Sequence, residues 1–292
     1  MKKITNITFI GLGVMGFPMA GHLSKNHNFS VTVWNRTIAR TEEWADKYDG
    51  SIASSIKNAI AKADMILICA GKDEDVEEII YAENGILQNI NSSIVIDHTT
   101  TSHKLAQKLA ASFKEKDIEF IDAPVSGGEI GAINAQLSIM AGGNKKTIQA
   151  VNPVLKHYAK NITHMGSHGY GQLAKMVNQI CIAGVLQGLS DGILFAENEN
   201  IDIEKLLSAI SGGAAQSWQM ENRALTMSKR EFDFGFAIKW MVKDLGYCLD
   251  RAEDNKTDLS FTKSVYDKYQ KLMKNGDGNL DTSALILQNK GE

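Results

Sequence analysis

The sequence predicts an α/β N-terminal domain, a long interdomain helix and an all-α C-terminal domain. Strand-like and helical segments alternate as far as about residue 164, which is the rhythm of a parallel sheet with crossover helices. A run from Met176 to Ser190 then carries no charge, and only helix-like segments follow it. Because 292 residues exceed the size that one hydrophobic core usually supports, we expect two domains, residues 1–164 and 165–292.

Composition and charge are those of an ordinary globular protein. The chain is 43% hydrophobic and 22% charged, and its net charge of −3 provides no basic surface for nucleic acid or for an anionic membrane. Its three cysteines, Cys69, Cys181 and Cys248, form no CxxC pair, which favours reduced thiols and a cytoplasmic location. His164 and His168 flank a segment that is not expected to be helical and bring no third ligand, so we expect no metal site.

The first motif with chemical content is a glycine-rich turn. A strand expected over Ile4 to Ile10 runs into Gly11, Leu12, Gly13, Val14, Met15 and Gly16, a GxGxxG pattern that opens a helix. Gly11 permits the tight turn, Gly13 lets the backbone approach a pyrophosphate, and Gly16 allows close packing of helix on strand. The pattern alone is equally compatible with a plain structural turn. Its setting between strand and helix favours a Rossmann-type domain that binds a dinucleotide.

The end of the second expected strand, Ser30 to Trp34, indicates which dinucleotide. NAD-binding chains place a carboxylate there to hold the ribose hydroxyls, but this sequence has Asn35, Arg36 and Thr37. A guanidinium can form charge-assisted hydrogen bonds with a 2′-phosphate, so NADP is favoured and NAD stays possible. The alternative is that Arg36 is a solvated surface arginine.

Further strands are expected near residues 64–69, 93–97, 118–123, 137–141 and 161–164. Two of them end in loops where open α/β sheets place ligands. The loop after 93–97 is rich in hydroxyls and includes Thr100, although Ser102 could simply cap the next helix. The loop after 118–123 contains Ser126, Gly127 and Gly128, whose backbone N–H groups and hydroxyl could receive a carboxylate.

A helix is expected from Tyr170 to Asn198, with apolar residues around most of its circumference. Its uncharged run is too short for a membrane span and contains amide side chains. Lys175, Asn178 and Gln179 are spaced to share one face, which we take as the candidate reaction centre. Helices near 203–210, 214–227, 236–252 and 260–273 follow. Lys239 and Lys243 share a face of the third of these, which suggests an anionic partner, although a solvated face is the commoner case.

Four motifs in order resemble the signatures of the β-hydroxyacid dehydrogenase family, which is related to 6-phosphogluconate dehydrogenase. They are GLGVMG near the N-terminus, DAPVSGG at 122–128, the pattern GxxGxGxxxKxxN from Gly166 to Asn178, and KDL at 243–245. The family includes 3-hydroxyisobutyrate dehydrogenase, tartronate semialdehyde reductase and glyoxylate/succinic semialdehyde reductase.

The resemblance implies roles for the residues of these motifs. Ser126, Gly127 and Gly128 would receive the substrate carboxylate, Thr100 would lie near the nicotinamide, and Lys175 would be the catalytic residue. Lys243 would close the site on substrate and cofactor. Members commonly carry Asn at the fourth position after the lysine, where this chain has Gln179, with Asn178 at the third; either amide could therefore orient the substrate.

The sequence thus predicts an NAD(P)-dependent oxidoreductase that interconverts a short 3-hydroxy acid and its semialdehyde or keto form. Lys175 would act as general acid/base, because an apolar helix near other cations lowers the pKa of a lysine. The C-terminal half has only three arginines, which disfavours a phosphosugar substrate. Alternatives are a phosphogluconate-type or imine-reducing relative, or a non-catalytic dinucleotide-binding scaffold. A homodimer or homotetramer is expected.

Overall fold

A computed structural model describes residues 3–91 and 93–289 of the chain. The chain divides into two compact units, one ending at Lys175 and the other starting at Met176. The predicted fold class is confirmed: the first unit is a Rossmann-type α/β domain, and the second is helical. The domain boundary expected at residue 164 stays a prediction.

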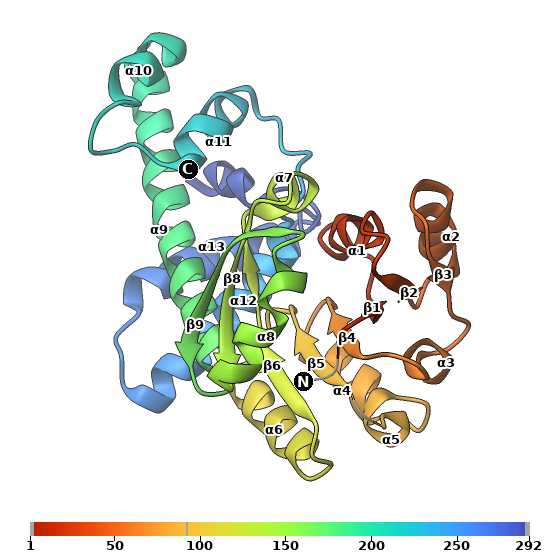
Figure 1. Cartoon of the computed structure of the whole chain (residues 1–292). Coiled ribbons are helices and arrows are strands. Elements are labelled where there is room, and N and C mark those ends of the chain that lie inside the picture. The colour runs from red at the N-terminus through yellow and green to blue at the C-terminus, as the bar shows by residue number, and fades with distance from the viewer. Residues whose placement is uncertain (1–2, 92, 290–292) are drawn as a thin grey trace. The chain divides into compact units, whose positions relative to one another are not determined.

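The first unit is built on one sheet with the strand order β3-β2-β1-β4-β5-β6-β8-β7, and β9 pairs with β8 (Figure 1). Its strands are β1 (Asn6–Ile10), β2 (Ser30–Trp34), β3 (Ser51–Ile52), β4 (Met65–Ile68), β5 (Ile94–Asp97), β6 (Glu119–Asp122), β7 (Val125–Ser126), β8 (Leu137–Gly143) and β9 (Ala159–Gly166). Strands β1 to β6 run parallel, and β8 runs antiparallel to β6 and β7. The carboxyl ends of the parallel strands therefore share one edge of the sheet, where ligands bind in such folds.

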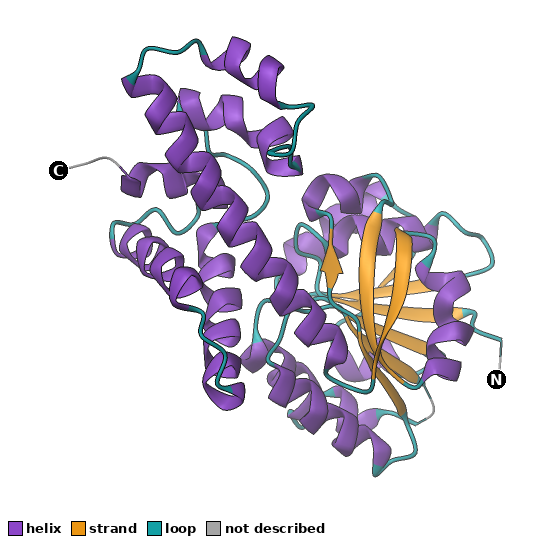
Figure 2. Cartoon of the chain, turned by 90° about the vertical axis from the view of Figure 1, so that its left-hand side faces the viewer, coloured by secondary structure: helices purple, strands orange, loops and turns teal. Residues whose placement is uncertain are grey.

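Helices cover both faces of this sheet (Figure 2). They are α1 (Gly16–Ser24), α2 (Ile38–Lys47), α3 (Ile56–Ile60), α4 (Asp73–Tyr81), α5 (Ile86–Asn89), α6 (His103–Lys114), α7 (Gly128–Ile133) and α8 (Lys145–Leu155). Successive residues of β1 enter separate cores, since Phe9 belongs to one buried cluster and Ile10 to another. Burial on both faces explains why β4 is apolar at every position instead of alternating.

Helix α9 (Tyr170–Asn198) has the predicted bounds. Within the described residues it is the one helix long and apolar enough to cross a membrane, judged by length and composition alone. The buried side chains of Gln179 and Gln187 on this helix hydrogen-bond to Asp244 and Asp191. Hydrogen-bonded buried amides are typical of a core helix.

The second unit continues with α10 (Ile203–Ile210), α11 (Trp218–Lys229), α12 (Ile238–Asn255), α13 (Ser260–Lys274) and the 3₁₀ helix η1 (Thr282–Asn289). Helix α11 begins four residues later than expected, because the Ser217 hydroxyl accepts a hydrogen bond from the Met220 N–H at 3.1 Å and caps the helix there. The short strands β3 and β7 and the helix η1 were not predicted.

Candidate functional site

The glycine turn between β1 and α1 has the form that the sequence predicts. Gly11 adopts a φ of +96°, and a Cβ there would clash with the Cys69 carbonyl oxygen. A Cβ at Gly16 would clash with the Gly11 carbonyl oxygen. At Gly13, by contrast, no atom of the described residues lies within 4 Å of the position of a Cβ, and the residue is exposed. The turn thus requires glycine at two positions and keeps an open backbone surface at the third.

Asn35 connects this turn to the end of β2. Its Oδ1 accepts a hydrogen bond from the Leu12 N–H at 2.9 Å, and its Nδ2 donates to the Thr37 carbonyl oxygen at 3.0 Å. Arg40, which the sequence analysis did not select, donates from Nε to the Leu12 carbonyl oxygen at 3.2 Å. Asn35 therefore holds the turn in place. Of the remaining residues of the motif, Val14 is exposed and Met15 is half-buried.

Arg36 extends from the same segment, and its side chain is 74% exposed. Its Nη1 lies 3.1 Å from Asp75 Oδ1 and 3.9 Å from Glu78 Oε2, both on α4. These carboxylates compete for the guanidinium that the sequence assigns to a 2′-phosphate. An ion pair this exposed contributes only about 0–1 kcal/mol, so it holds the arginine weakly.

The loop after β5 is fixed by backbone and side-chain hydrogen bonds. The Thr99 hydroxyl accepts from the Ala70 N–H at 2.9 Å, and the Thr99 N–H donates to Asp97 Oδ1 at 2.9 Å. Ser102 caps α6 by accepting from the Leu105 N–H at 3.0 Å, so the capping interpretation is correct for this residue. Thr100 lies between these anchors and is half-buried.

Two buried ionisable residues, Asp97 and His98, directly precede Thr99 of this loop. Burial raises the pKa of Asp97 to about 7, with a smaller contribution from Asp122, its neighbour on β6. Burial also lowers the pKa of His98 to about 4. His98 contacts the Ala123 carbonyl oxygen at 2.7 Å and the Tyr158 hydroxyl at 2.8 Å. The first of these contacts makes Nδ1 the protonated nitrogen of a neutral ring.

The loop expected to receive a carboxylate is partly a strand. Val125–Ser126 forms β7, because Ser126 pairs with Ser138 of β8, and so the expectation of a plain loop was wrong. Gly127 and Gly128 follow with φ values of +130° and +62°, which other residues rarely adopt. Both are exposed, and no atom of the described residues lies within 4 Å of a Cβ position at Gly128. The backbone here is accessible to a ligand.

On α9, Lys175 is only 8% exposed, Asn178 is half-buried and Gln179 is fully buried. Gln179 donates from Nε2 to Asp244 Oδ2 at 2.6 Å, and its Oε1 accepts from Asn178 Nδ2 at 2.8 Å. Both ends of the Gln179 amide are thus used within the chain. Helical spacing places Lys175 and these two amides on one face.

Asp244 connects α9 to α12 within the second unit. Its Oδ1 lies 3.1 Å from Lys243 Nζ, while its Oδ2 accepts from Gln179. The Lys243 ammonium is 5.8 Å from the Trp240 ring centroid and 5.5 Å from that of Tyr247. Sequence reasoning named Asp244 only as part of the KDL motif, and its contacts with Gln179 and Lys243 were missed.

Lys239 and the two histidines, which the sequence analysis also considered, form hydrogen bonds within the chain. Lys239 donates to Asn279 Oδ1 at 2.8 Å, so the two lysines of α12 differ in surroundings. His164 and His168 each donate from Nε2 to a backbone carbonyl oxygen, at 3.0 Å from Gly143 and 3.0 Å from Phe120. These contacts give both imidazoles structural roles.

Comparison with known proteins extends over nearly the whole chain. Residues 6–166 match the model of the NAD-binding domain of 6-phosphogluconate dehydrogenase. Residues 169–288 match the NAD-binding domain of NADP-dependent 3-hydroxyisobutyrate dehydrogenase.

Individual relatives agree with these two matches. An oxidoreductase of Shewanella frigidimarina is 45% identical over 98% of each chain. The 2-hydroxy-3-oxopropionate reductase of Escherichia coli is 33% identical over 95% of this chain and 94% of that one. The structure of Mycobacterium tuberculosis 3-hydroxyisobutyrate dehydrogenase with L-serine is similar at a TM-score of 0.88 and 26% identity, covering 99% of this chain and all of that one.

Proposed function

Since the chain belongs to the β-hydroxyacid dehydrogenase family of NAD(P)-dependent oxidoreductases, we propose that it interconverts a short 3-hydroxy acid and the corresponding semialdehyde or keto acid. The observation that carries this proposal is the nearly buried Lys175 on the same face of α9 as Asn178. A lysine there can accept and donate a proton at a reacting oxygen. A non-catalytic scaffold would have no chemical reason to keep it.

In this proposal the chain's own residues move the proton and orient the substrate. A bound nicotinamide supplies the hydride acceptor or donor. Lys175 Nζ accepts the hydroxyl proton during oxidation and returns a proton to the carbonyl oxygen during reduction. Asn178 orients that oxygen. Gln179 serves as its support, because the Gln179 amide is engaged at both ends by Asn178 and Asp244.

Ser126, Gly127 and Gly128 are proposed to bind the substrate carboxylate. The two glycines are exposed and adopt positive φ values, which lets backbone N–H groups converge on an anion. Lys243 is proposed to add a positive charge on the substrate and cofactor side, as the family resemblance implies.

The arginines of the second unit argue against a phosphosugar. Each lies near a carboxylate: Arg223 Nε is 3.4 Å from Asp281, Arg230 Nη2 is 2.7 Å from Glu197, and Arg251 Nη1 is 3.5 Å from Asp254. A phosphate clamp would need a guanidinium directed to the ligand.

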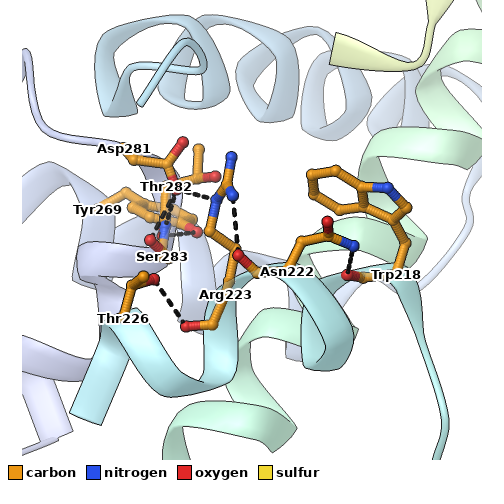
Figure 3. Close-up of polar contacts among 8 residues, drawn as sticks. All are labelled: Trp218, Asn222, Arg223, Thr226, Tyr269, Asp281, Thr282 and Ser283. Carbon is orange, nitrogen blue, oxygen red and sulfur yellow. Dashed lines mark hydrogen bonds and ion pairs between the residues drawn. The ribbon is translucent and has the colours of Figure 1, made fainter. Parts of the chain in front are cut away.

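Arg223 shows most clearly that such an arginine is structural (Figure 3). Its guanidinium carbon lies 4.1 Å from the Phe234 ring centroid and 5.1 Å from that of Trp218. Asp281, its ionic partner, also accepts hydrogen bonds from the N–H and the hydroxyl of Ser283 at 3.0 and 2.7 Å. Arg223 thus fastens the C-terminal segment to α11.

NADP is the proposed preferred cofactor, with NAD as the alternative. The open space at Gly13 leaves room for a pyrophosphate at the N-terminus of α1. Arg36 and Thr37 would contact the 2′-phosphate, and Arg40 brings a second guanidinium to the same turn. No carboxylate stands at the end of β2 to repel that phosphate.

We further propose a homodimer or homotetramer that acts in the cytoplasm. Helix α9 exposes a stripe of apolar side chains, with Val177 61%, Val185 39% and Phe195 65% exposed. A second copy of the chain is the proposed cover for this stripe.

The test is a screen of small hydroxy acids with NADP⁺ and of semialdehydes with NADPH, followed by nicotinamide absorbance. Turnover of short carboxylates is expected. Turnover confined to phosphosugars, imines or uncharged alcohols would contradict the proposal. Size-exclusion chromatography with light scattering measures the oligomer, and a monomer would contradict the proposed assembly.

A further inference from the structure

The fully buried side chain of Gln172 connects helix α9 to the loop after β5. Its Oε1 accepts a hydrogen bond from the Thr101 N–H at 3.1 Å, and its Nε2 donates to the Thr99 carbonyl oxygen at 2.8 Å. These two groups belong to the two peptide bonds on either side of Thr100. One amide side chain thus fixes both peptides of the residue expected beside the nicotinamide.

The backbone of Gln172 is anchored as well. Its N–H donates to Asp122 Oδ2 at 3.1 Å, and the Gly169 N–H donates to Asp122 Oδ1 at 2.7 Å. Asp122 is fully buried at the end of β6, just before the segment that contains Ser126 of β7. The first turn of α9 is therefore hydrogen-bonded both to the loop of Thr100 and to the strand end that leads to Ser126.

The start of α9 also packs closely on the sheet at two glycines. A Cβ at Gly171 would clash with the Met140 carbonyl oxygen and would lie 2.6 Å from the Asp122 carbonyl oxygen. A Cβ at Gly142 would lie 2.5 Å from Asp122 Oδ1 and 2.8 Å from the Gly171 N. The carboxylate of Asp122 thus lies close to both glycines, where a larger side chain would not fit.

We propose that Gln172 is a positioning residue that sets Lys175 relative to Thr100. Lys175 follows Gln172 by three residues, so the two lie on neighbouring positions of one helical face. Removing the amide would leave the Thr99 carbonyl and the Thr101 N–H without hydrogen-bond partners. These residues are only 2% and 1% exposed, so water cannot replace the amide unless the loop shifts. This inference rests on the proposed function, in which Lys175 exchanges a proton with the substrate.

The test compares Gln172→Leu with Gln187→Leu in the full chain. Gln187 is a matched control on the same helix: it is 5% exposed and hydrogen-bonds to Asp191 at 2.8 Å and Lys268 at 3.1 Å. A displacement of about 1 Å can lower a rate by about 100-fold. We therefore expect kcat to fall by about 10- to 100-fold in Gln172→Leu, with the Kd for NADPH within about twofold of wild type. Gln187→Leu should lower Tm similarly but keep kcat within about twofold.

A second measurement requires no substrate. Amide hydrogen exchange of the ligand-free protein should become faster at Thr101 in Gln172→Leu and stay unchanged there in Gln187→Leu. Equal kcat losses in the two variants, an unchanged kcat in Gln172→Leu, or unchanged exchange at Thr101 would each overturn the inference. If Gln172→Leu does not fold, Gln172→Glu is compared by kcat alone, because it keeps the acceptor for the Thr101 N–H and loses only the donor to Thr99; an unchanged kcat would then overturn the inference.

The two failures can be told apart. Full activity in Lys175→Ala would contradict the proposed function, while the exchange data would still decide whether Gln172 holds the loop. Loss of activity in Lys175→Ala together with normal kcat in Gln172→Leu would reject the positioning role alone.

Discussion

Replacing Arg36 by alanine should change the cofactor preference without disturbing the site. The exposed pair with Asp75, at 3.1 Å, is worth about 0–1 kcal/mol. A charge-assisted contact with a 2′-phosphate contributes about 1.5–3 kcal/mol. The phosphate therefore outcompetes the carboxylate, and Arg36→Ala should raise the apparent KM for NADP(H) by about 10- to 100-fold. NAD(H) should be nearly unaffected, because the glycine turn that holds the pyrophosphate stays intact.

The carboxylate supplies a variant that should act in the opposite direction. Asp75→Asn removes the negative charge that competes for Arg36, and so it should lower the KM for NADP(H) by up to about fivefold. It should not improve binding of NAD(H), which has no phosphate at that position.

The assay is kcat/KM with each cofactor for wild type, Arg36→Ala and Asp75→Asn. A wild type that prefers NAD(H) would refute the reasoning. So would equal losses for both cofactors in Arg36→Ala, since they would indicate a general defect in dinucleotide binding.

Three further predictions concern the turn, the buried acid and the orienting carboxylate. Gly13→Ala should keep Tm near wild type and weaken the binding of NADP(H) and NAD(H) alike, as measured by fluorescence titration. Gly16→Ala should lower Tm by several degrees, because its Cβ would clash with the backbone. A larger loss of Tm in Gly13→Ala than in Gly16→Ala would contradict the geometry of the turn. The pKa of Asp97 rises from 3.8 to about 7 on folding, so its stabilising contribution falls as pH rises through that window. The Tm of Asp97→Asn relative to wild type should therefore rise between about pH 4 and about pH 7, and a constant difference in thermal unfolding would rule this out. Asp244→Asn should lower kcat/KM for the acid substrate by about 10- to 100-fold, because it weakens a charged hydrogen bond to Gln179. The Kd for NADPH should be unchanged. A wild-type kcat/KM would show that Asp244 does not orient Gln179 for catalysis.

The fold could be predicted from local patterns where those patterns are long. The glycine turn, the buried strands and the bounds of α9 each depend on residues close together in the sequence, and they were correct. Strands β3 and β7 were missed because each has two residues and forms only through pairing with a distant strand. Helix η1 was missed because its apolar residues fit no helical period.

The site was predicted less completely, because several of its contacts join residues that are far apart in the sequence. Lys175, Asn178 and Gln179 could be grouped by helical spacing, but the partner of Gln179 is 65 residues away. The Asp75 that pairs with Arg36 is 39 residues from it. The sequence offered one unused signal for Gln172, a long amide side chain in an otherwise glycine-rich and apolar helix start.

The measurement that tests the central claim most directly is turnover by Lys175→Ala, with the exposed Lys146→Ala as a matched surface control. Assays use saturating NADPH and the best semialdehyde from the screen, and NADPH titration shows whether the cofactor site is intact. If Lys175 exchanges the proton with the substrate, turnover should fall by about 10²- to 10⁴-fold, while the NADPH Kd and the Lys146→Ala activity stay near wild type. Retention of most of the activity in Lys175→Ala would show that the proton passes through another group and would contradict the account.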